Sequence, residues 1–322
     1  MKAAVYYETG GPEVLKYEEV ADPVLRKGGI LIDVAAIGIQ GGDTLNRGGG
    51  ALATNPHIVG YQASGTVREV GEGVTSFVVG QPVVATMAYG SHASLVSVPA
   101  TSAWAIPDGR SFETAAGSPI EFGTAHDCLF EFGRLKAGET VLIQAGASGV
   151  GLAAIQLAEA AGATVIATAS SDDRLARLKD FGLHHGINYA VKNVAAEVMA
   201  LTNNRGVDLV VDSVGGPTLE GSIASLAYRG RVSWVGNAGR DAHPPAINGL
   251  MGKNASINGV FLGAEMAMNP QRTHPMISEL MQRVASGGLT VQIDKSFPLS
   301  DAAGAHEYIE SRKAFGRVIL IP

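Results

Sequence analysis

The sequence contains a single cysteine, Cys128, among its 322 residues. One thiol cannot form a disulfide within the chain, and it excludes zinc sites built from several cysteines. Basic residues are in the minority, since 24 Lys and Arg face 30 Asp and Glu and give a formal net charge of −6. Because binding to a nucleic-acid backbone needs clustered positive charge, we expect no nucleic-acid partner.

Long apolar runs are absent as well. No stretch reaches about 18 apolar residues without a polar interruption, so we expect no membrane span. The first residues, Met1–Glu8, lack the apolar core of a secretory signal and are typical of a strand. These features predict a cytoplasmic protein, and the hydrophobic content of 46% over this length allows two domains with full cores.

A glycine-rich turn is the most informative feature that is present. An apolar segment at 141–144 leads into Gly146-Ala147-Ser148-Gly149-Val150-Gly151, and an apolar helical segment follows. This order directs backbone N–H groups and a helix N-terminus toward a phosphate, which predicts a dinucleotide site. Gly146 is expected to make the tight turn, and Gly151 to let helix and strand pack closely. A strand, turn and helix without any ligand is the alternative interpretation.

The pattern of expected strands and helices changes near residue 125. Short β-like runs punctuated by Gly and Pro precede it, which favours an antiparallel barrel or sandwich. Strands then alternate with helices, as in a parallel doubly wound sheet. The expected strands are 141–144, 164–168, 187–189, 207–212, 231–235 and 257–261, and the expected helices are 149–161, 172–181, 194–201 and 218–228.

After Gly263 the pattern loosens. Helices near 275–285 and 302–311 and strands near 291–293 and 317–321 are expected there. The last strand has the composition of a buried strand. If it returns to the first domain, the nucleotide domain is an insertion between two parts of the other.

The residues after the second nucleotide-domain strand favour NADP(H) over NAD(H). An NAD site carries an acid about 20 residues beyond the fingerprint, whereas Ala167–Ser171 contains none. We expect Thr168 and Ser170 to contact the cofactor, and the guanidinium of Arg174 suits a 2′-phosphate. Asp172 and Asp173 fall in a helical first turn, where acids favour the helix dipole. Arg174 as an ordinary solvated helix residue is the alternative.

Several motifs along the chain carry a family resemblance. They are Gly10–Leu15, Ala36–Gln40 with Asp43-Thr44, Ala145–Gly151, Ile187–Tyr189, Asp212–Gly216 and Gly236-Asn237. With them the chain resembles the zinc-independent, zeta-crystallin-like quinone oxidoreductases of the medium-chain dehydrogenase/reductase superfamily. The resemblance implies an α/β fold, with a GroES-like β-barrel domain plus a Rossmann doubly wound parallel sheet. It implies a GroES-like catalytic domain at 1–121 and 263–322, an NADPH-binding domain at 122–262, and a homodimer joined through the Rossmann sheets.

The same resemblance implies the cofactor contacts. Arg174 and Tyr189 are similar to 2′-phosphate contacts, although Tyr189 is equally typical of a core strand residue. Ser213, Gly236 and Asn237 match positions near the ribose and nicotinamide. The remaining implied contacts are Gly146, Ser148, Gly149 and Val150 at the pyrophosphate, Phe261 and Leu262 at the nicotinamide, and Arg317.

The comparison with zinc-dependent relatives shows that the zinc ligands of that group are missing here. Those relatives place a Cys at Gln40 and a His at Tyr61, and neutral Gln and Tyr are poor zinc ligands, so we expect no metal. Hydride transfer without a Lewis acid suits a quinone or an α,β-unsaturated carbonyl, because the added charge is delocalised. Gln40, Tyr61 and Thr124 are the catalytic candidates near the nicotinamide, and Gln40 and Thr124 are also cofactor contacts. Hydrogen-bonded structural side chains are the alternative for each.

Three further expectations concern the pocket, the histidines and the function. The family's usual Asn is Gln40 here, and Gly41 and Gly42 follow it, which predicts an altered and roomier substrate pocket. His92 and His126 are the histidines best suited to a pocket. An NADPH-binding protein without significant turnover, with a structural role or a role in binding RNA or a partner protein, is the alternative function.

Overall fold

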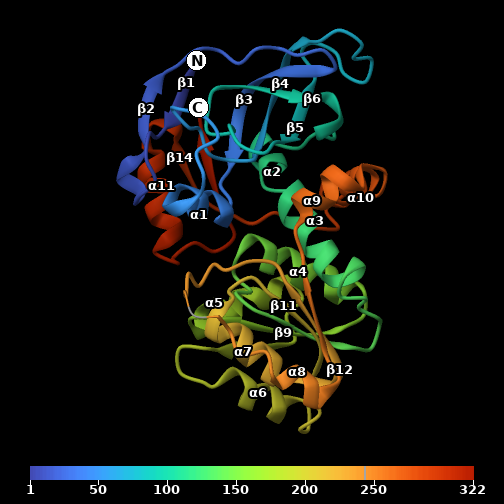
Figure 1. Ribbon diagram of the computed structural model, residues 1–322. Coiled ribbons are helices and arrows are strands. Elements are labelled where there is room, and N and C mark those ends of the chain that lie inside the picture. Colours follow the sequence, from blue (N-terminus) through green and yellow to red (C-terminus); the bar gives the residue numbers. More distant parts are fainter. Residues whose placement is uncertain (243) are drawn as a thin grey trace. The chain divides into compact units, whose positions relative to one another are not determined.

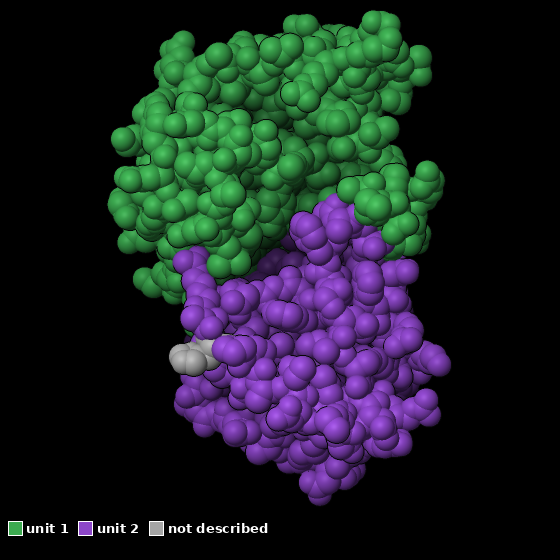
Figure 2. Space-filling model, in the orientation of Figure 1, with its two compact units in different colours: residues 1–120, 266–322 green, residues 121–265 purple. Residues whose placement is uncertain are grey.

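The computed structural model describes residues 1–242 and 244–322. These residues form two compact units, one of residues 1–120 and 266–322 and one of residues 121–265 (Figure 2). We call them the first and the second unit.

The first unit is built on a mainly antiparallel sheet with the strand order β14-β15-β3-β4-β5-β7, and β6 pairs with β3 (Figure 1). The final strand β15 (Arg317–Ile321) pairs antiparallel with β3 (Gly29–Gly38), so the chain end returns to the N-terminal sheet. The other strands are β4 (Gln62–Val70), β5 (Pro82–Thr86), β6 (Leu95–Pro99), β7 (Ala103–Ala105) and β14 (Ile293–Pro298), beside a separate pair, β1 (Lys2–Val5) and β2 (Lys16–Glu19).

Four helices of the first unit accompany this sheet. They are α1 (Gly41–Gly49), α2 (Phe112–Ala116), α10 (Pro270–Ala285) and α11 (Ala302–Glu310). The buried faces of β3 and β15 share one core cluster with Ala302 and Ala305 of α11. Helix α10 begins five residues before the predicted Pro275, because Pro270 occupies the first helical position, where a missing N–H costs nothing.

The second unit contains a parallel sheet of six strands among its described residues, in the order β10-β9-β8-β11-β12-β13. This confirms the predicted doubly wound sheet. Its strands are β8 (Thr140–Ile143), β9 (Thr164–Ala169), β10 (His185–Asn188), β11 (Val207–Asp212), β12 (Leu226–Trp234) and β13 (Ser256–Gly259). The order reverses between β8 and β11, and ligands of such sheets bind outside the carboxyl ends of the strands at that point.

Helices cover the faces of this sheet (Figure 1). They are α4 (Gly149–Ala160), α5 (Asp172–Leu178), α6 (Val194–Leu201), α7 (Gly216–Ala224) and α8 (Gly249–Lys253). Leu142 and Val210 pack with Val198 of α6 and Ile223 of α7 in one buried cluster. Two more helices, α3 (Pro119–His126) and α9 (Leu262–Met268), run across the positions where the chain passes from one unit to the other.

Two predicted boundaries in this unit are wrong. The helix expected at 218–228 ends at Ala224, and β12 begins at Leu226 and continues through Gly230. Leu226 is 1% exposed and pairs with Val207 of β11, so its burial in the sheet prevails over the helical pattern. The strand expected to reach Phe261 ends at Gly259.

Within the part of the chain that the structure describes, no helix has both the length and the hydropathy to cross a bilayer.

Leu142→Ala tests the core of the second unit. Leu142 is fully buried in β8, and we expect its truncation to reduce the free energy of unfolding of this unit by about 2–5 kcal/mol. Hydrogen exchange of the β8 and β11 amides measures this unit separately. Leu201→Ala, at a side chain that is 40% exposed, is the matched control and should cost about 0.5 kcal/mol or less. Equal losses at both positions would contradict the assigned core.

Candidate functional site

The glycine-rich turn lies directly after β8, at the point where the strand order reverses. Ala145 is its left-handed residue, with a φ of 52°, and the Gly146 N–H donates to the Thr168 carbonyl at 2.8 Å. Gly146 lies within the tight turn, as predicted, because the Ser148 N–H donates to the Ala145 carbonyl at 2.9 Å and closes the turn around it. Packing also requires this glycine, because an added Cβ would lie 2.9 Å from Ala167 Cβ and 3.0 Å from Leu178 Cδ1.

Helix α4 begins on this turn and exposes its N-terminus. Ser148 Oγ accepts the Gly151 N–H at 3.0 Å and caps the helix. A Cβ on Gly151 would lie 2.4 Å from the Ala145 carbonyl oxygen, which confirms that this glycine permits a close approach. Ser148, Gly149 and Val150 are half-exposed. Because the first N–H groups of a helix have no partner within it and carry the positive end of its dipole, this turn suits an anion.

A chain of buried hydrogen bonds holds the turn from below. Thr168 Oγ1 accepts the Ala145 N–H at 3.1 Å and donates to Gln144 Oε1 at 2.8 Å. Gln144 Nε2 donates to Ser222 Oγ at 3.0 Å, and that hydroxyl donates to Asp212 Oδ2 at 2.6 Å. Thr168 is 1% exposed, so these bonds support a role in holding the turn, and direct cofactor contact stays a prediction.

Gln144 and Ser222 were not singled out from the sequence. Their signal is weak but physical, since a polar residue that follows an apolar strand (Gln144) or lies on the buried face of a helix (Ser222) needs a partner once it is buried. Both are buried, as is Asp212. The structure thus links β8, β9, β11 and α7 at one edge of the sheet.

The loops after β11 and β12 lie side by side at the same edge. Asp212 Oδ1 accepts the N–H groups of Val214 and Gly215 at 2.8 and 2.9 Å. The Ala238 N–H donates to the Ser213 carbonyl at 3.0 Å. These bonds place Ser213 beside the segment that contains Gly236 and Asn237, as a shared ribose or nicotinamide surface requires. After β13, Phe261 is 73% exposed and Leu262 is 3% exposed.

The predicted phosphate contacts lie beyond the ends of β9 and β10. Arg174 is in the first turn of α5, where Ser171 Oγ accepts its N–H at 3.4 Å, and Ser170 precedes it half-exposed. Asp172 Oδ1 accepts a bond from Asn188 Nδ2 at 3.1 Å, so this acid is engaged by the end of β10. Tyr189 is 44% exposed, and its interpretation as a core residue is wrong.

In the first unit, Gln40 caps the N-terminus of α1 and Tyr61 lies against the first turn of that helix. Gln40 is 4% exposed, and its N–H donates to Asp43 Oδ2 at 2.8 Å. A Cβ built on Gly42 would lie 2.5 Å from Tyr61 Oη, so the Tyr61 phenol rests on the first turn of the helix. At Gly42 the tyrosine occupies the space that a side chain would fill, whereas nothing lies within 4 Å of an added Cβ on Gly41.

Arg317 supports the same region. It is 7% exposed, and its Nη2 donates to the Ile39 carbonyl at 2.5 Å, directly before Gln40. Its contact with a cofactor stays a prediction. Thr124 lies in α3 in the second unit and is 7% exposed. The grouping of Gln40, Tyr61 and Thr124 around one nicotinamide also stays a prediction.

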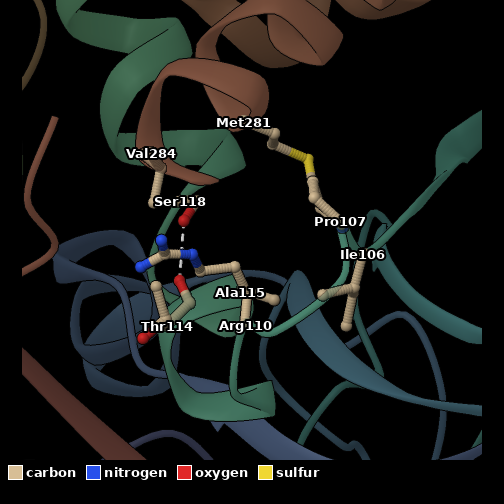
Figure 3. Close-up of a pocket in the computed structure, with 8 residues that line it drawn as sticks. All are labelled: Ile106, Pro107, Arg110, Thr114, Ala115, Ser118, Met281 and Val284. Atoms are coloured by element: carbon tan, nitrogen blue, oxygen red, sulfur yellow. Dashed lines mark hydrogen bonds between the residues drawn. The ribbon is translucent and has the colours of Figure 1, made fainter. Parts of the chain in front are cut away.

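Other features do not add a site. Among residues 1–242 and 244–322, no three or more His, Cys, Asp or Glu side chains are grouped as metal ligands. Cys128 is fully buried, and burial followed by the Asp127 charge raises the pKa of its thiol, so it is unreactive at neutral pH. A small pocket of the first unit combines Ile106, Met281 and Val284 with Arg110 and Ser118 (Figure 3). It contains none of the predicted site residues, and Ser118 is engaged by the Thr114 carbonyl at 2.6 Å.

Two family models match the chain. One is described as an alcohol dehydrogenase GroES-like domain and matches residues 26–108, and the other as a zinc-binding dehydrogenase and matches residues 149–285. A quinone oxidoreductase of Pseudomonas aeruginosa is 34% identical over 97% of this chain and 97% of its own length. A 2-haloacrylate reductase of a Burkholderia species is 32% identical over 99% of this chain and 98% of its own length.

Solved structures agree with these relatives. The quinone oxidoreductase of Escherichia coli, complexed with NADPH, matches with a TM-score of 0.95 and 31% identity over 100% of both chains. That of Pseudomonas syringae pv. Tomato matches with a TM-score of 0.94 and 33% identity over 100% of this chain and 99% of the other. A GroES-like domain joined to a Rossmann sheet defines the medium-chain dehydrogenase/reductase class, and the predicted fold class is confirmed. The chain belongs to the zeta-crystallin-like quinone oxidoreductase family of that superfamily.

Gly151→Ala tests the close approach of α4 to the turn. The new methyl meets the Ala145 carbonyl, and we expect a loss of about 1–3 kcal/mol in the stability of the second unit. Gly221→Ala in α7 is the control, because nothing lies within 4 Å of its Cβ, and we expect a gain of about 0.5–1 kcal/mol. Urea unfolding measures both changes. A neutral or stabilising Gly151→Ala would show that the contact is absent.

Proposed function

We propose that this protein is a zinc-independent, NADPH-dependent reductase that transfers hydride to a quinone or an α,β-unsaturated carbonyl. One observation carries the proposal: a glycine turn lies at the point where the strand order reverses, and the cation Arg174 lies beyond β9. The end of β9 lacks the acidic residue that binds the ribose in an NAD site. The names of two relatives, a quinone oxidoreductase and a 2-haloacrylate reductase, support the reaction class.

The residues of the second unit fit NADPH. The N–H groups of Gly149 and Val150, in half-exposed residues at the start of a twelve-residue helix, would bind the pyrophosphate, with Ser148 beside them as the cap. Arg174 and Tyr189 would bind the 2′-phosphate at the ends of β9 and β10. The remaining contacts of the proposal are Gly146, Thr168 and Ser170 around the turn, Ser213, Gly236 and Asn237 at the ribose, and Phe261, Leu262, Thr124, Gln40 and Arg317 toward the nicotinamide.

NADPH supplies the hydride, and the chain supplies orientation and hydrogen bonds. Gln40 has a side-chain amide that can donate to the nicotinamide carboxamide or to a substrate carbonyl. Tyr61 and Thr124 carry hydroxyls that can donate to the developing oxyanion. Since Gln40 and Tyr61 are neutral where zinc-dependent relatives have ligands, the acceptor must delocalise the added charge itself.

Conjugated acceptors meet that requirement. A quinone accepts hydride and becomes an aromatic hydroquinone oxyanion, and an α,β-unsaturated carbonyl accepts it at the β-carbon and becomes an enolate. An acrylate, as named in one relative, has the same conjugated double bond. One hydride geometry therefore serves both classes of substrate.

Assembly and location complete the proposal. We propose a catalytic domain at 1–121 and 263–322 and an NADPH domain at 122–262, close to the bounds of the compact units. A cytoplasmic homodimer joined through the Rossmann sheets is proposed as well. The outer strand β13 and the exposed side chains of Tyr228 and Met251, 68% and 83% exposed, support this interface.

The turnover experiment tests the reaction. NADPH oxidation is followed at a fixed enzyme concentration with 1,2-naphthoquinone, 1,4-benzoquinone and a simple enone. We expect turnover with at least one of the three. Tight NADPH binding without turnover of any acceptor would overturn the proposal and favour the binding protein without catalysis.

Arg174→Ala tests the choice of cofactor. Loss of a charged hydrogen bond to the 2′-phosphate should weaken NADPH binding by about 10- to 100-fold and leave NADH binding nearly unchanged. Titration calorimetry measures both dissociation constants. Arg177→Ala on the same helix is the matched control and should change neither. Equal losses for NADPH and NADH would refute the phosphate contact.

A further inference from the structure

A buried cluster of basic side chains lies in the first unit. Arg47 of α1 is 1% exposed, and His92 and His306 are 0% exposed. Arg47 Nη1 lies 3.2 Å from His306 Nδ1, and His306 Nε2 lies 3.0 Å from His92 Nε2. Arg47 also donates through Nη2 to Glu310 Oε1 at 2.5 Å and through Nε to the Gly10 carbonyl at 3.1 Å.

The donors in this cluster have a single consistent direction. A guanidinium has donors and no acceptor, so His306 Nδ1 must accept the bond from Arg47. The proton of a neutral His306 is then on Nε2, which donates to His92 Nε2. His92 in turn carries its proton on Nδ1, which lies 3.3 Å from Ser91 Oγ. The order of donation runs from Arg47 through His306 and His92 to Ser91.

Burial keeps both rings neutral, as this order requires. It lowers the pKa of His92 to about 3. The pKa of His306 is also well below its usual value, through burial first and then through the charges of His92 and Arg47. The other charged or titratable groups that face the cluster are Glu310, Asp43 and Tyr6. A second proton on His306 would set its Nδ1–H against an N–H of Arg47. A second proton on His92 would set its Nε2–H against the Nε2–H of His306.

The cluster packs against the backbone next to Tyr61 and includes a residue of the helix that follows Gln40. Arg47 lies near the end of the helix that starts after Gln40. Gly60, just before Tyr61, has a φ of 100°, and an added Cβ would lie 2.1 Å from both His92 Nδ1 and Ser91 Oγ. Its carbonyl accepts the Ser91 N–H at 3.0 Å.

These contacts form a closed ring. It runs from α1 through Gly42 to Tyr61, through Gly60 to His92, and through His306 back to Arg47 on α1. His92 and His306 therefore lie between the backbone that precedes Tyr61 and the helix that follows Gln40.

We propose that His92 and His306 are positioning residues, and that their ordered hydrogen bonds hold Gln40 and Tyr61 in the geometry needed for hydride transfer. This rests on the proposed function only in making Gln40 and Tyr61 catalytic. The link itself is a feature of the first unit alone.

Nitrogen NMR of the histidine rings tests the proton order in the full-length protein. Two-bond ¹H–¹⁵N spectra, assigned with His92→Gln and His306→Gln, should show a proton on His306 Nε2 and on His92 Nδ1. Neither ring should titrate between about pH 5.5 and 8, where an exposed histidine does. Any other pair of tautomers, or a titration in this range, would overturn the proposal.

Paired variants of His306 test the positioning role. Glutamine offers both an acceptor for Arg47 and a donor for His92, and leucine offers neither. His306→Leu should lower kcat with 1,2-naphthoquinone by about 10- to 100-fold, and His306→Gln should restore most of it. The side-chain amide resonance of Gln40 and the ring resonances of Tyr61 should shift in the leucine variant and return in the glutamine variant.

Val98→Ala controls for lost stability. Val98 of β6 is 2% exposed in the hydrophobic core of the first unit, so its truncation lowers stability without removing a member of the buried basic cluster. We expect unchanged kcat and unchanged Gln40 and Tyr61 resonances. Equal changes in Val98→Ala and His306→Leu, or unmoved resonances in His306→Leu, would overturn the positioning role. If the wild type reduces no acceptor, the proposed function fails, and the resonances still decide whether the cluster holds these two side chains.

Discussion

The arrangement of the second unit depends on the hydroxyl group of Thr168. It accepts from the backbone of Ala145 in the turn and donates to Gln144, directly after the neighbouring strand β8, and so it joins the ends of β8 and β9. Without it, a buried amide and a buried N–H would lose partners in surroundings where an unsatisfied polar group costs about 1–3 kcal/mol. Through Gln144 and Ser222 the same chain reaches Asp212, which holds the loop after β11. The rigid edge leaves the first N–H groups of α4 available for an anion.

The first unit uses the same principle with different side chains. Its buried chain consists of Arg47, His306, His92 and Ser91, and it joins segments far apart in sequence, since His92 and His306 are 214 positions apart. Fully satisfied polar networks in a low-dielectric interior admit few alternative arrangements. Each unit thus contains a buried hydrogen-bond chain close to residues of its proposed site.

The two adjacent glycines Gly41 and Gly42 differ in what fills the space beside them. Gly42 leaves space that the Tyr61 phenol fills, whereas Gly41 leaves space with no neighbour within 4 Å. Tyr61 thus fills the space beside Gly42, and a roomier substrate pocket stays a prediction. Tyr61 takes the position of a missing side chain on α1, and its hydroxyl is held beside the Gln40 end of the helix. Tyr61 can lie against the helix only because residue 42 has no side chain, and neither residue by itself predicts this contact.

The sequence by itself determined the local elements of this protein. The alternation of strands and helices, the caps Ser148 and Ser171, and the missing acid after β9 depend on residues within a few positions of each other, where backbone propensity and capping decide the conformation. The tertiary structure alone decided that Ala145 is left-handed, that Leu226 belongs to a strand, that Thr168 is buried beneath the turn, and that His92 meets His306. Those outcomes depend on which strands become neighbours and which polar groups burial forces to find partners, and neither is encoded within a short stretch of chain.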